Sequence, residues 1–372
     1  KSQEKTSINK LILSLLKELL VPFLAVVTAI IVGGVVIAVA GGNPFDAYIG
    51  LSEGAFGSPR ALSETAIWAT PYIFAGLAVA IGFKGGLFNI GAEGQLACGA
   101  VVAALIGYAL PQALGMDLPA IIHLPLTVLG GMLAGALWAA IPGWLKARFG
   151  GHEVINTIMM NYIALNIASF LLNGPMKDPS PTNVVARTPQ IAASARIAPI
   201  FEGYRLHWGF VLALLVAFGV WWLLWKTNLG FEIRTAGTNP DAAKYAGINV
   251  SRTIIVTMAL SGLLAGLAGA VEVTGLNYRH ELGFSVGYGF DAIAIALLGK
   301  NHPVGVILAS LLFAAMRNGA TRMQFLTQIP TDVISVIQAL ILLFVAADAI
   351  IRFIYRIKVK EEKAALTRGW NG

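Results

Sequence analysis

The sequence predicts an all-α integral membrane protein with about ten transmembrane helices. Of its 372 residues, 57% are apolar and only 12% are charged, whereas a soluble domain has about 45–50% apolar and about 25% charged residues. The mean hydropathy is +0.74, and apolar segments recur along the whole chain, many of them close to the roughly 20 residues that a helix needs to cross a bilayer. Strong alternation of period 2 is absent, which argues against a β-barrel.

Ten apolar segments are candidate spans. The first half of the chain contains Leu20–Ala40, Leu62–Phe83, Gln95–Leu110, Pro119–Ile141 and Val154–Leu172. The second half contains Trp208–Trp225, Thr253–Val273, Gly287–Gly299, Val304–Met316 and Val333–Ile351. The segments at 287–299 and 304–316 are too short to span alone, and such pieces are tolerated where backbone is buried in protein or lines a cavity.

The distribution of basic residues predicts the topology. Ten spans place both termini on one side, and if that side is cytoplasmic, 18 of the 26 Lys and Arg residues face the cytoplasm and 8 face outside. This asymmetry favours an N-in, C-in arrangement, because cytoplasmic loops are enriched in Lys and Arg. A net charge of +7 would indicate nucleic-acid binding in a soluble protein, but here we expect no nucleic-acid partner. Residues 1–17 lack the apolar stretch of a cleavable signal peptide, so we expect none.

We expect one transmembrane domain over residues 1–372 with four segments outside the membrane. They are a cytoplasmic N-tail (1–19), an external loop (173–206), a cytoplasmic loop (226–252) and a cytoplasmic C-tail (353–372). A similar five-residue segment precedes spans 2 and 7 on opposite sides, Asn43 to Ala47 and Asn239 to Ala243. This echo favours an inverted repeat of spans 2–5 and 7–10.

The cytoplasmic loop contains a short helix at residues 239–247 with both ends specified. Asn239 is a suitable N-cap, Pro240 suits the first helical position and Asp241 complements the positive helix end. Gly247 is a natural C-terminal stop. A helix of two turns is marginal in water, so this one is either a capped surface turn or an element that a partner holds.

Three segments resemble a known family. They are Gly86-Leu-Phe-Asn-Ile-Gly-Ala-Glu-Gly-Gln-Leu96, Gly151-His-Glu-Val-Ile-Asn156 and Asn239–Ile248. Together they resemble the permease subunits of bacterial ABC importers for branched-chain amino acids, ribose and simple sugars, and nucleosides, most closely the nucleoside type. The resemblance covers nearly the whole chain. It implies a multi-pass subunit of the bacterial cell membrane that imports nucleosides by alternating access.

The same resemblance implies the partners. We expect a cytosolic ABC ATPase, an external substrate-binding protein and a second, paralogous permease chain that forms a heterodimer with this one. In such permeases the short cytoplasmic helix couples to the ATPase. Here that role falls on Glu232, Arg234, Thr238, Asn239, Pro240, Asp241, Ala242, Lys244 and Tyr245.

The sequence itself predicts no enzymatic activity and no cofactor in this chain. A P-loop needs G-x-x-x-x-G-K-[ST], but Gly299-Lys300 is followed by Asn301, and Ala294 stands where the first glycine belongs. His152 and Glu153 begin a zinc-protease motif whose second histidine is replaced by Asn156, so we expect no metal site. ATP and magnesium are therefore expected on the partner ATPase.

Polar residues at membrane depth are the candidates for the substrate pathway, since each is costly to bury in lipid. A neutral nucleoside calls for aromatic stacking and amide hydrogen bonds rather than fixed charge. The candidates are Phe88, Asn89, Glu93, Gln95, Asn156, Asn161, Tyr162 and Asp291. Asn156, Asn161 and Asn166 are five residues apart, so they fan out around a helix and cannot all face one path.

Three alternatives stay open. A permease of the same family could carry a simple sugar such as ribose. An ion-coupled secondary transporter could use Glu93 and Asp291 to bind its coupling ions. An intramembrane enzyme is the third possibility, but the sequence offers it no convincing nucleophile and base.

Overall fold

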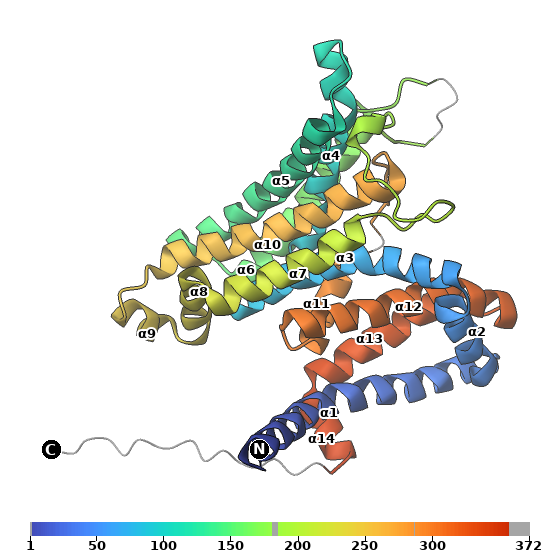
Figure 1. Cartoon of the computed structure of the whole chain (residues 1–372), viewed down its shortest axis with the longest axis vertical. Helices are drawn as coiled ribbons and strands as arrows, with labels where there is room; N and C mark the ends of the chain where they lie inside the picture. The colour runs from blue at the N-terminus through green and yellow to red at the C-terminus, as the bar shows by residue number, and fades with distance from the viewer. Residues whose placement is uncertain (1, 181–184, 286, 357–372) are drawn as a thin grey trace.

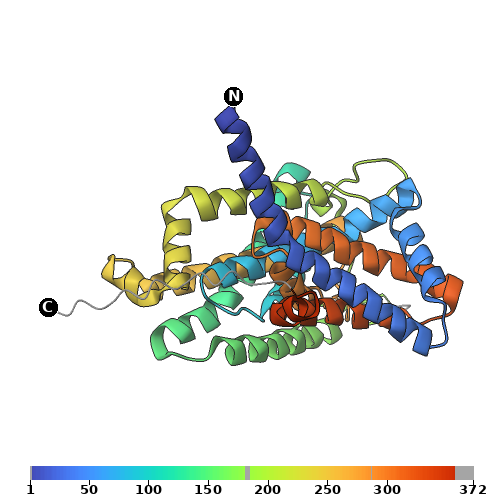
Figure 2. The same cartoon turned by 90° about the horizontal axis from the view of Figure 1, so that it is seen from below.

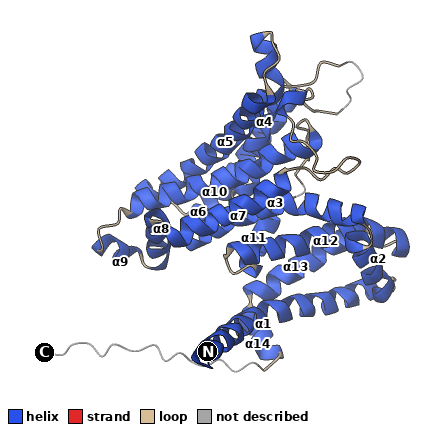
Figure 3. Ribbon diagram, viewed as in Figure 1, coloured by secondary structure: helices blue, strands red, loops and turns tan. Residues whose placement is uncertain are grey.

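The computed structural model describes residues 2–180, 185–285 and 287–356, so the C-tail at 357–372 lies outside the described residues. In this part of the chain the regular structure is helical, with only isolated β-bridges besides (Figure 3). Eight of the described helices are long and apolar enough to cross a membrane. They are α1 (Ser2–Val39), α3 (Pro59–Lys84), α4 (Ala92–Leu114), α5 (Ala120–Phe149), α6 (Glu153–Asn173), α7 (Gly209–Lys226), α10 (Val250–Glu272, continued by the π-helix η2, Val273–Asn277) and α12 (Pro303–Thr327).

The remaining described helices are shorter. Two of them, α11 (Tyr288–Leu298) and α13 (Asp332–Ala346), are apolar. The others are α2 (Pro44–Phe56), α8 (Asn228–Thr238), α9 (Pro240–Tyr245), α14 (Asp348–Ile354) and the 3-10 turn η1 (Ala193–Ala195). Each of the ten predicted spans thus overlaps at least one helix, and the prediction of an all-α membrane protein is confirmed.

Two of the predicted segments are wrong in extent. The segment at 304–316 is not short, because α12 continues to Thr327. The predicted segment ends where Arg317 and Arg322 lower the hydropathy. In the structure the Arg317 guanidinium lies 5.8 Å from the ring centre of Trp68 on α3, and Arg322 pairs with Glu53 on α2 at 3.4 Å. The segment at 333–351 is broken at Ala347 into α13 and α14. Hydropathy misses this break because a single charged residue, Asp348, lies in an otherwise apolar stretch.

Helix α3 lies at the centre of the molecule. It packs against α12 and α11 on one side and against α10 and α7 on the other, and Figure 1 shows it between these two groups of helices. Its apolar window is 83% buried, whereas those of α5 and α6 are 22% buried. A helix covered by protein on all sides holds its neighbours in place, so α3 connects the two groups.

Helix α10 approaches α5 closely, because both helices carry glycine at the contact. A Cβ atom on Gly262 would lie 2.3 Å from the Gly135 carbonyl oxygen, and one on Gly266 would lie 2.4 Å from the Gly131 carbonyl oxygen. Small residues four apart allow such backbone contact in membranes, where packing rather than the hydrophobic effect drives helix association. The α5–α10 pair is therefore specified by its glycines.

The molecule has two distinct ends. Helix α2 lies at one end, where the long loop after α6 also runs, and α8 and α9 lie at the other (Figures 1 and 2). Helix α1 begins toward the α9 end, and α14 also lies toward it (Figure 1). We call these ends the α2 side and the α9 side.

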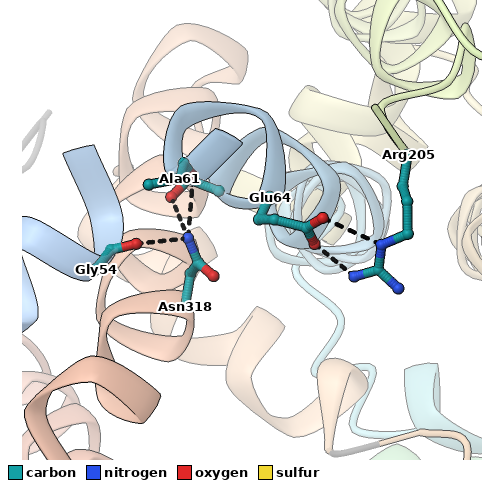
Figure 4. Close-up of polar contacts among 6 residues, drawn as sticks. Gly54, Ala61, Glu64, Arg205 and Asn318 are labelled. Carbon is teal, nitrogen blue, oxygen red and sulfur yellow. Dashed lines mark hydrogen bonds and ion pairs between the residues drawn. The ribbon is translucent and has the colours of Figure 1, made fainter. Parts of the chain in front are cut away.

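Polar contacts fasten the α2 side (Figure 4). Arg205 of the long loop donates to both carboxylate oxygens of Glu64 on α3, at 3.1 and 2.5 Å. Bidentate pairs of this kind are stronger than single hydrogen bonds, and the one with Glu64 raises the pKa of Arg205 further above its ordinary value. The loop is therefore anchored to the central helix.

Candidate functional site

The chain turns back into the protein between α3 and α4. Gly86 adopts a φ of +70°, and a Cβ atom there would lie 2.8 Å from the Gly237 carbonyl oxygen of α8, so glycine is required for both the turn and the contact. The following residues run to Ala92, where α4 begins. This return loop, residues 85–91, therefore touches α8 at one end and supports the first turn of α4 at the other.

A buried amide pair fixes the return loop. Asn89 and Gln95 exchange two side-chain hydrogen bonds, each 3.0 Å long. Asn89 also donates to Ser261 Oγ on α10 at 2.8 Å and accepts from the Gly91 N–H at 2.9 Å. Both amides are 1% exposed, and buried polar groups persist when they are satisfied in this way.

Asn161 of α6 completes the support of α4. Its side-chain oxygen accepts from the Gly94 N–H at 2.8 Å, and its amide nitrogen donates to the Ile90 carbonyl at 2.9 Å. The first N–H groups of a helix have no partner within it. Asn161 supplies one for α4 and at the same time ties α6 to the return loop.

Glu93 joins the N-termini of two helices. Its carboxyl accepts from the Gly289 N–H of α11 at 2.7 Å and from the hydroxyl of Ser285. A carboxylate is favourable at the positive end of a helix, and here it stands at the start of both α4 and α11. A Cβ atom on Gly289 would lie 2.2 Å from the Glu93 nitrogen, so the approach of the two helices requires glycine.

Aromatic side chains surround Asp291, two residues after Gly289. The Tyr72 hydroxyl donates to Asp291 Oδ2 at 2.7 Å. Tyr288 packs edge-on against Tyr72 and also contacts Trp68, with ring centres 5.1 and 6.1 Å away. The carboxyl group of Asp291 is thus held by a tyrosine of the central helix, and Tyr288 of α11 packs against that tyrosine.

A cavity of about 230 Å³ lies beside Glu93. Its walls come from α4, α6 and the segment 280–285 that precedes α11. A larger hollow of about 400 Å³ lies elsewhere, between the start of α3 and the long loop, and its lining is almost entirely apolar (Pro59, Leu62, Ser63, Phe201, Tyr204 and Leu206). Because convergent polar groups mark binding sites, the smaller cavity is the candidate.

The predicted pathway residues divide into two groups. The structure brings five of them together around the starts of α4 and α11: Asn89, Glu93, Gln95, Asn161 and Asp291. The side chains of the other three take no part in these contacts. Phe88 packs on Phe83 with ring centres 4.9 Å apart, Asn156 lies at the first turn of α6 and Tyr162 is 62% exposed on α6.

Sequence reasoning missed several residues of this site, namely Tyr72, Ser261, His280 and Ser285. Tyr72 and Ser261 lie within apolar spans, where one hydroxyl carries little signal. Ser285 lies in the glycine-rich run Gly283–Phe290, which stands out in the sequence before Asp291, since irregular backbone of this kind is tolerated where it is buried in protein or lines a cavity.

The α9 helix forms as its caps predict. The Asn239 side-chain oxygen accepts from the Ala242 N–H at 3.0 Å, Pro240 is the first residue and Gly247 has a φ of +82°. Asp241, Ala242, Lys244 and Tyr245 are exposed, Tyr245 to 97%. The other predicted coupling residues lie on α8, namely Glu232, Arg234 and Thr238; Thr238 donates to the Arg234 carbonyl at 2.8 Å.

Residues 61–346 match the family described as branched-chain amino acid transport system, permease component. The chain belongs to this family. It is a multi-pass protein of the cell membrane and, like its family, a permease component of a transport system. The resemblance found in the three sequence segments is thus confirmed.

Three relatives match almost the full length. The guanosine ABC transporter permease protein NupP of Bacillus subtilis is 42% identical, over 91% of this chain and 96% of its own length. The glucose ABC transporter permease protein TsgB13 of Haloferax volcanii is 36% identical (87% and 86%). The nucleoside ABC transporter permease protein NupB of Lactococcus lactis is 35% identical (94% and 95%).

A second permease protein from each of the two bacteria also matches. NupQ of Bacillus subtilis is 31% identical over 257 residues, and NupC of Lactococcus lactis is 29% identical over 252 residues. No solved structure matches the chain significantly.

Proposed function

We propose that this chain is the transmembrane subunit of an ATP-driven nucleoside importer. The observation that carries the proposal is the near-full-length identity to NupP and NupB, which are named as guanosine and nucleoside permeases. The site at the starts of α4 and α11 combines amides, hydroxyls and aromatic rings with the carboxyl groups of Glu93 and Asp291. These groups can hydrogen-bond to a polar, uncharged solute, and a few such groups in an otherwise apolar site fix its orientation. A simple sugar is the second candidate, because TsgB13 is named as a glucose permease.

We place the α9 side in the cytoplasm, with about ten membrane crossings and both termini inside. This orientation puts 18 of the 26 Lys and Arg residues in the cytoplasm, as the positive-inside tendency requires. Short helices α11 and α13 complete the ten crossings in a bundle where neighbouring helices cover them.

We infer an inverted repeat of α3–α6 and α10–α13. Each unit follows a short helix that begins with Asn-Pro, α2 at one end of the molecule and α9 at the other, with Asn43 and Asn239 as N-caps. Within the arrangement, α3 packs on α11 and α12 just as α10 packs on α4 and α5. Opposite placement of matching elements is what a two-fold axis in the membrane plane requires.

The exposed face of α9 is the proposed docking surface for the ATPase. A six-residue helix is not stable in water alone, and a tyrosine that is 97% exposed supplies an aromatic anchor of the kind enriched at interfaces. ATP and magnesium bind to that partner, and this chain contributes no cofactor. Movement of α9 would reach the candidate site through α8, whose Gly237 contacts the return loop.

The partner chain is a second, related permease, as NupQ and NupC suggest. Helix α6 carries a polar stripe at helical spacing, composed of Tyr162, Asn166, Ser169 and Asn173. Asn166, Asn173 and Tyr162 are exposed on a helix of membrane-spanning length, and lipid is an unfavourable neighbour for such groups. The second permease chain and the solute path between the chains would cover this stripe. An external binding protein delivers the substrate from the α2 side.

Uptake by cells that contain the complete importer tests the transport proposal. Radiolabelled guanosine is expected to accumulate and radiolabelled glucose is not, and an inactive ATPase abolishes uptake while an uncoupler at constant ATP does not. Accumulation of glucose alone would favour the sugar importer. Uptake that persists with an inactive ATPase but is abolished by the uncoupler would favour an ion-coupled transporter.

Co-purification tests the docking surface. Asp241→Arg combined with Tyr245→Ala is expected to abolish co-purification of the ATPase. The matched control is Asp117→Arg, an exposed acidic residue in the turn between α4 and α5 on the α2 side, which should leave the complex intact. Normal recovery of the ATPase with the double variant would contradict the assignment.

A further inference from the structure

The cavity beside Glu93 contains hydrogen-bonding groups that the protein itself does not use fully. It measures about 230 Å³ and lies between α4, α6 and residues 280–285. Leu165, Ala168 and Leu172 of α6 line one wall. In the sequence they directly precede three residues of the polar stripe, Asn166, Ser169 and Asn173. The cavity therefore adjoins the proposed solute path.

Glu93 has spare capacity to accept hydrogen bonds. Among the described residues, its two carboxyl oxygens receive one donor each, from Ser285 and from the Gly289 N–H. A carboxylate offers about four acceptor positions, so two remain. Two adjacent donors on a solute could occupy both oxygens at once, in the bidentate manner that carboxylates favour.

His280 has a buried ring nitrogen without a partner. The residue is 2% exposed, and among the described residues no group hydrogen-bonds to its Nδ1 atom. Leaving a buried polar atom unpaired costs free energy, and such an atom in a native structure calls for an explanation. A solute in the cavity that His280 lines would supply the missing partner.

Two backbone hydrogen bonds and a ring contact fix the position of His280. The backbone N–H of His280 donates to Thr188 Oγ1 at 3.0 Å, and the His280 carbonyl accepts from the backbone N–H of Thr188 at 2.9 Å. Its ring packs edge-on against Phe284 with centres 4.5 Å apart. Burial lowers the pKa of His280 to about 4, so the imidazole is neutral at pH 7 and offers one donor and one acceptor.

The size of the cavity limits what enters it. It is smaller than the roughly 300–1,000 Å³ of pockets for drug-sized ligands. It therefore fits one ring system with its polar edge, and the rest of a larger solute would extend along α6.

Building on the proposed nucleoside transport, we propose that this cavity is a binding subsite for one half of the nucleoside, in which Glu93 accepts two adjacent donors and His280 hydrogen-bonds to the same ring system. Nucleosides present such a donor pair in two places, the 2′,3′-diol of ribose and the N1–H and N2–H edge of guanine. Adenine and cytosine edges alternate donor and acceptor, so they do not match a carboxylate in this way.

Analogue discrimination in the complete importer tests the subsite. Uptake of radiolabelled guanosine is measured with guanosine, 2′-deoxyguanosine, 3′-deoxyguanosine and inosine as competitors, for the wild type, Glu93→Gln and His280→Phe. Because the external binding protein is the same throughout, a changed ranking of competitors belongs to this chain. A filling variant, Leu165→Trp, is compared with Ile167→Trp, which alters an exposed residue of the same helix outside the cavity.

We expect Glu93→Gln to raise KM for guanosine about tenfold or more, as loss of a charge-assisted hydrogen bond predicts. Glu93→Gln should also remove the preference for guanosine over one class of competitor only. That class is the deoxyguanosines if ribose occupies the cavity, or inosine if the base does. His280→Phe should raise KM and keep the ranking, and Leu165→Trp should block uptake while Ile167→Trp does not.

The subsite is overturned if the wild type takes up guanosine but His280→Phe and Leu165→Trp keep its KM and ranking. Neither of these two substitutions removes the hydrogen bonds that join Glu93 of α4 to Ser285 and to Gly289 of α11, so the result is decisive even if Glu93→Gln fails to fold. A wild-type importer that takes up no nucleoside would instead overturn the proposed function and, with it, this subsite.

Discussion

Asn318 joins three helices through one side-chain amide. Its amide nitrogen lies 3.0 Å from the carbonyl oxygens of Gly54 and Ala61 and from Thr65 Oγ1, so two hydrogens serve three acceptors on α2 and α3 (Figure 4). Gly54 contributes one of the last carbonyls of α2, which lack partners within the helix. We expect Asn318→Leu to destabilise the protein by about 1–3 kcal/mol, the cost of leaving such groups unsatisfied.

Thermal melting of the purified protein in detergent measures this loss. The matched control is Gln324→Leu, which changes an exposed amide on the same helix and should leave the melting temperature nearly unchanged. Equal melting temperatures for the two variants would show that Asn318 does not connect the helices energetically.

His207 makes stability depend on pH. Burial lowers its pKa to about 4, whereas the unfolded residue has a pKa near 6.5. Between these values the unfolded state binds more protons than the folded state, so stability present above pH 6.5 declines as the pH falls toward 4. The difference amounts to about 3 kcal/mol, at 1.36 kcal/mol for each pH unit.

The structure supplies the reason for this shift in His207. Its Nδ1 accepts from the Gly209 N–H at 3.1 Å, and its ring lies where a Cβ atom on Gly275 would approach within 2.6 Å. Melting curves from pH 7 to pH 4 should therefore flatten in His207→Gln. His152→Gln, at an exposed position, is the control, and an unchanged slope in His207→Gln would contradict the assignment.

At the residue scale, sequence identified one partner of several polar contacts in the candidate site. Glu93 and Asn161 are conspicuous because polar groups at membrane depth are costly, and both are buried and satisfied. Their partners were not predictable, since Gly289 follows Glu93 by 196 residues and offers only a backbone N–H. Pairings of this kind depend on which helices meet, which local sequence does not contain.

At the scale of elements, local chemistry predicted α9 but hydropathy misjudged α12. The caps of α9 lie within its own sequence, so Asn239 and Gly247 define it without tertiary information. Helix α2 starts with the same Asn-Pro signal and could have been predicted in the same way. The extension of α12 depends on Trp68 and Glu53 accepting its arginines, and that requires the fold.

The glycine contact between α5 and α10 yields a prediction for an element pair. Gly266→Leu should separate the helices and destabilise the protein by at least about 1–3 kcal/mol, since overpacking against backbone cannot relax through a side chain. Gly219→Leu on α7 is the matched control, because a Cβ atom there meets nothing within 4 Å. The melting temperature in detergent and the yield of folded protein are measured for both variants. Equal values for Gly266→Leu and Gly219→Leu would show that the close approach of α5 and α10 is dispensable.

At the scale of the molecule, sequence predicted where apolar helices lie along the chain but not how deeply each enters the membrane. Tyr288–Leu298 is an apolar helix of 11 residues that starts where Glu93 reaches Gly289, and α4 likewise starts at a return loop. Hydropathy reports composition along the chain but not how far a segment enters the membrane. Helix α3 packs on α10 and on the two helices that follow α10, namely α11 and α12, and α10 packs on α4 and α5, which follow α3. This arrangement is likewise a property of the assembled bundle.

The proposed orientation of the whole molecule is testable with single cysteines. Cys98 is the only cysteine, so Cys98→Ser gives a background for Asp117→Cys and Glu202→Cys on the α2 side and for Arg148→Cys and Lys244→Cys toward the α9 side; all four positions are exposed. A membrane-impermeant maleimide should label the first pair in intact cells and the second pair only after permeabilisation. Because the bound ATPase can shield position 244, Arg148→Cys is the control on that side. The reverse pattern would invert the topology and place α9 beyond the reach of a cytosolic ATPase, which would overturn the coupling proposal as well.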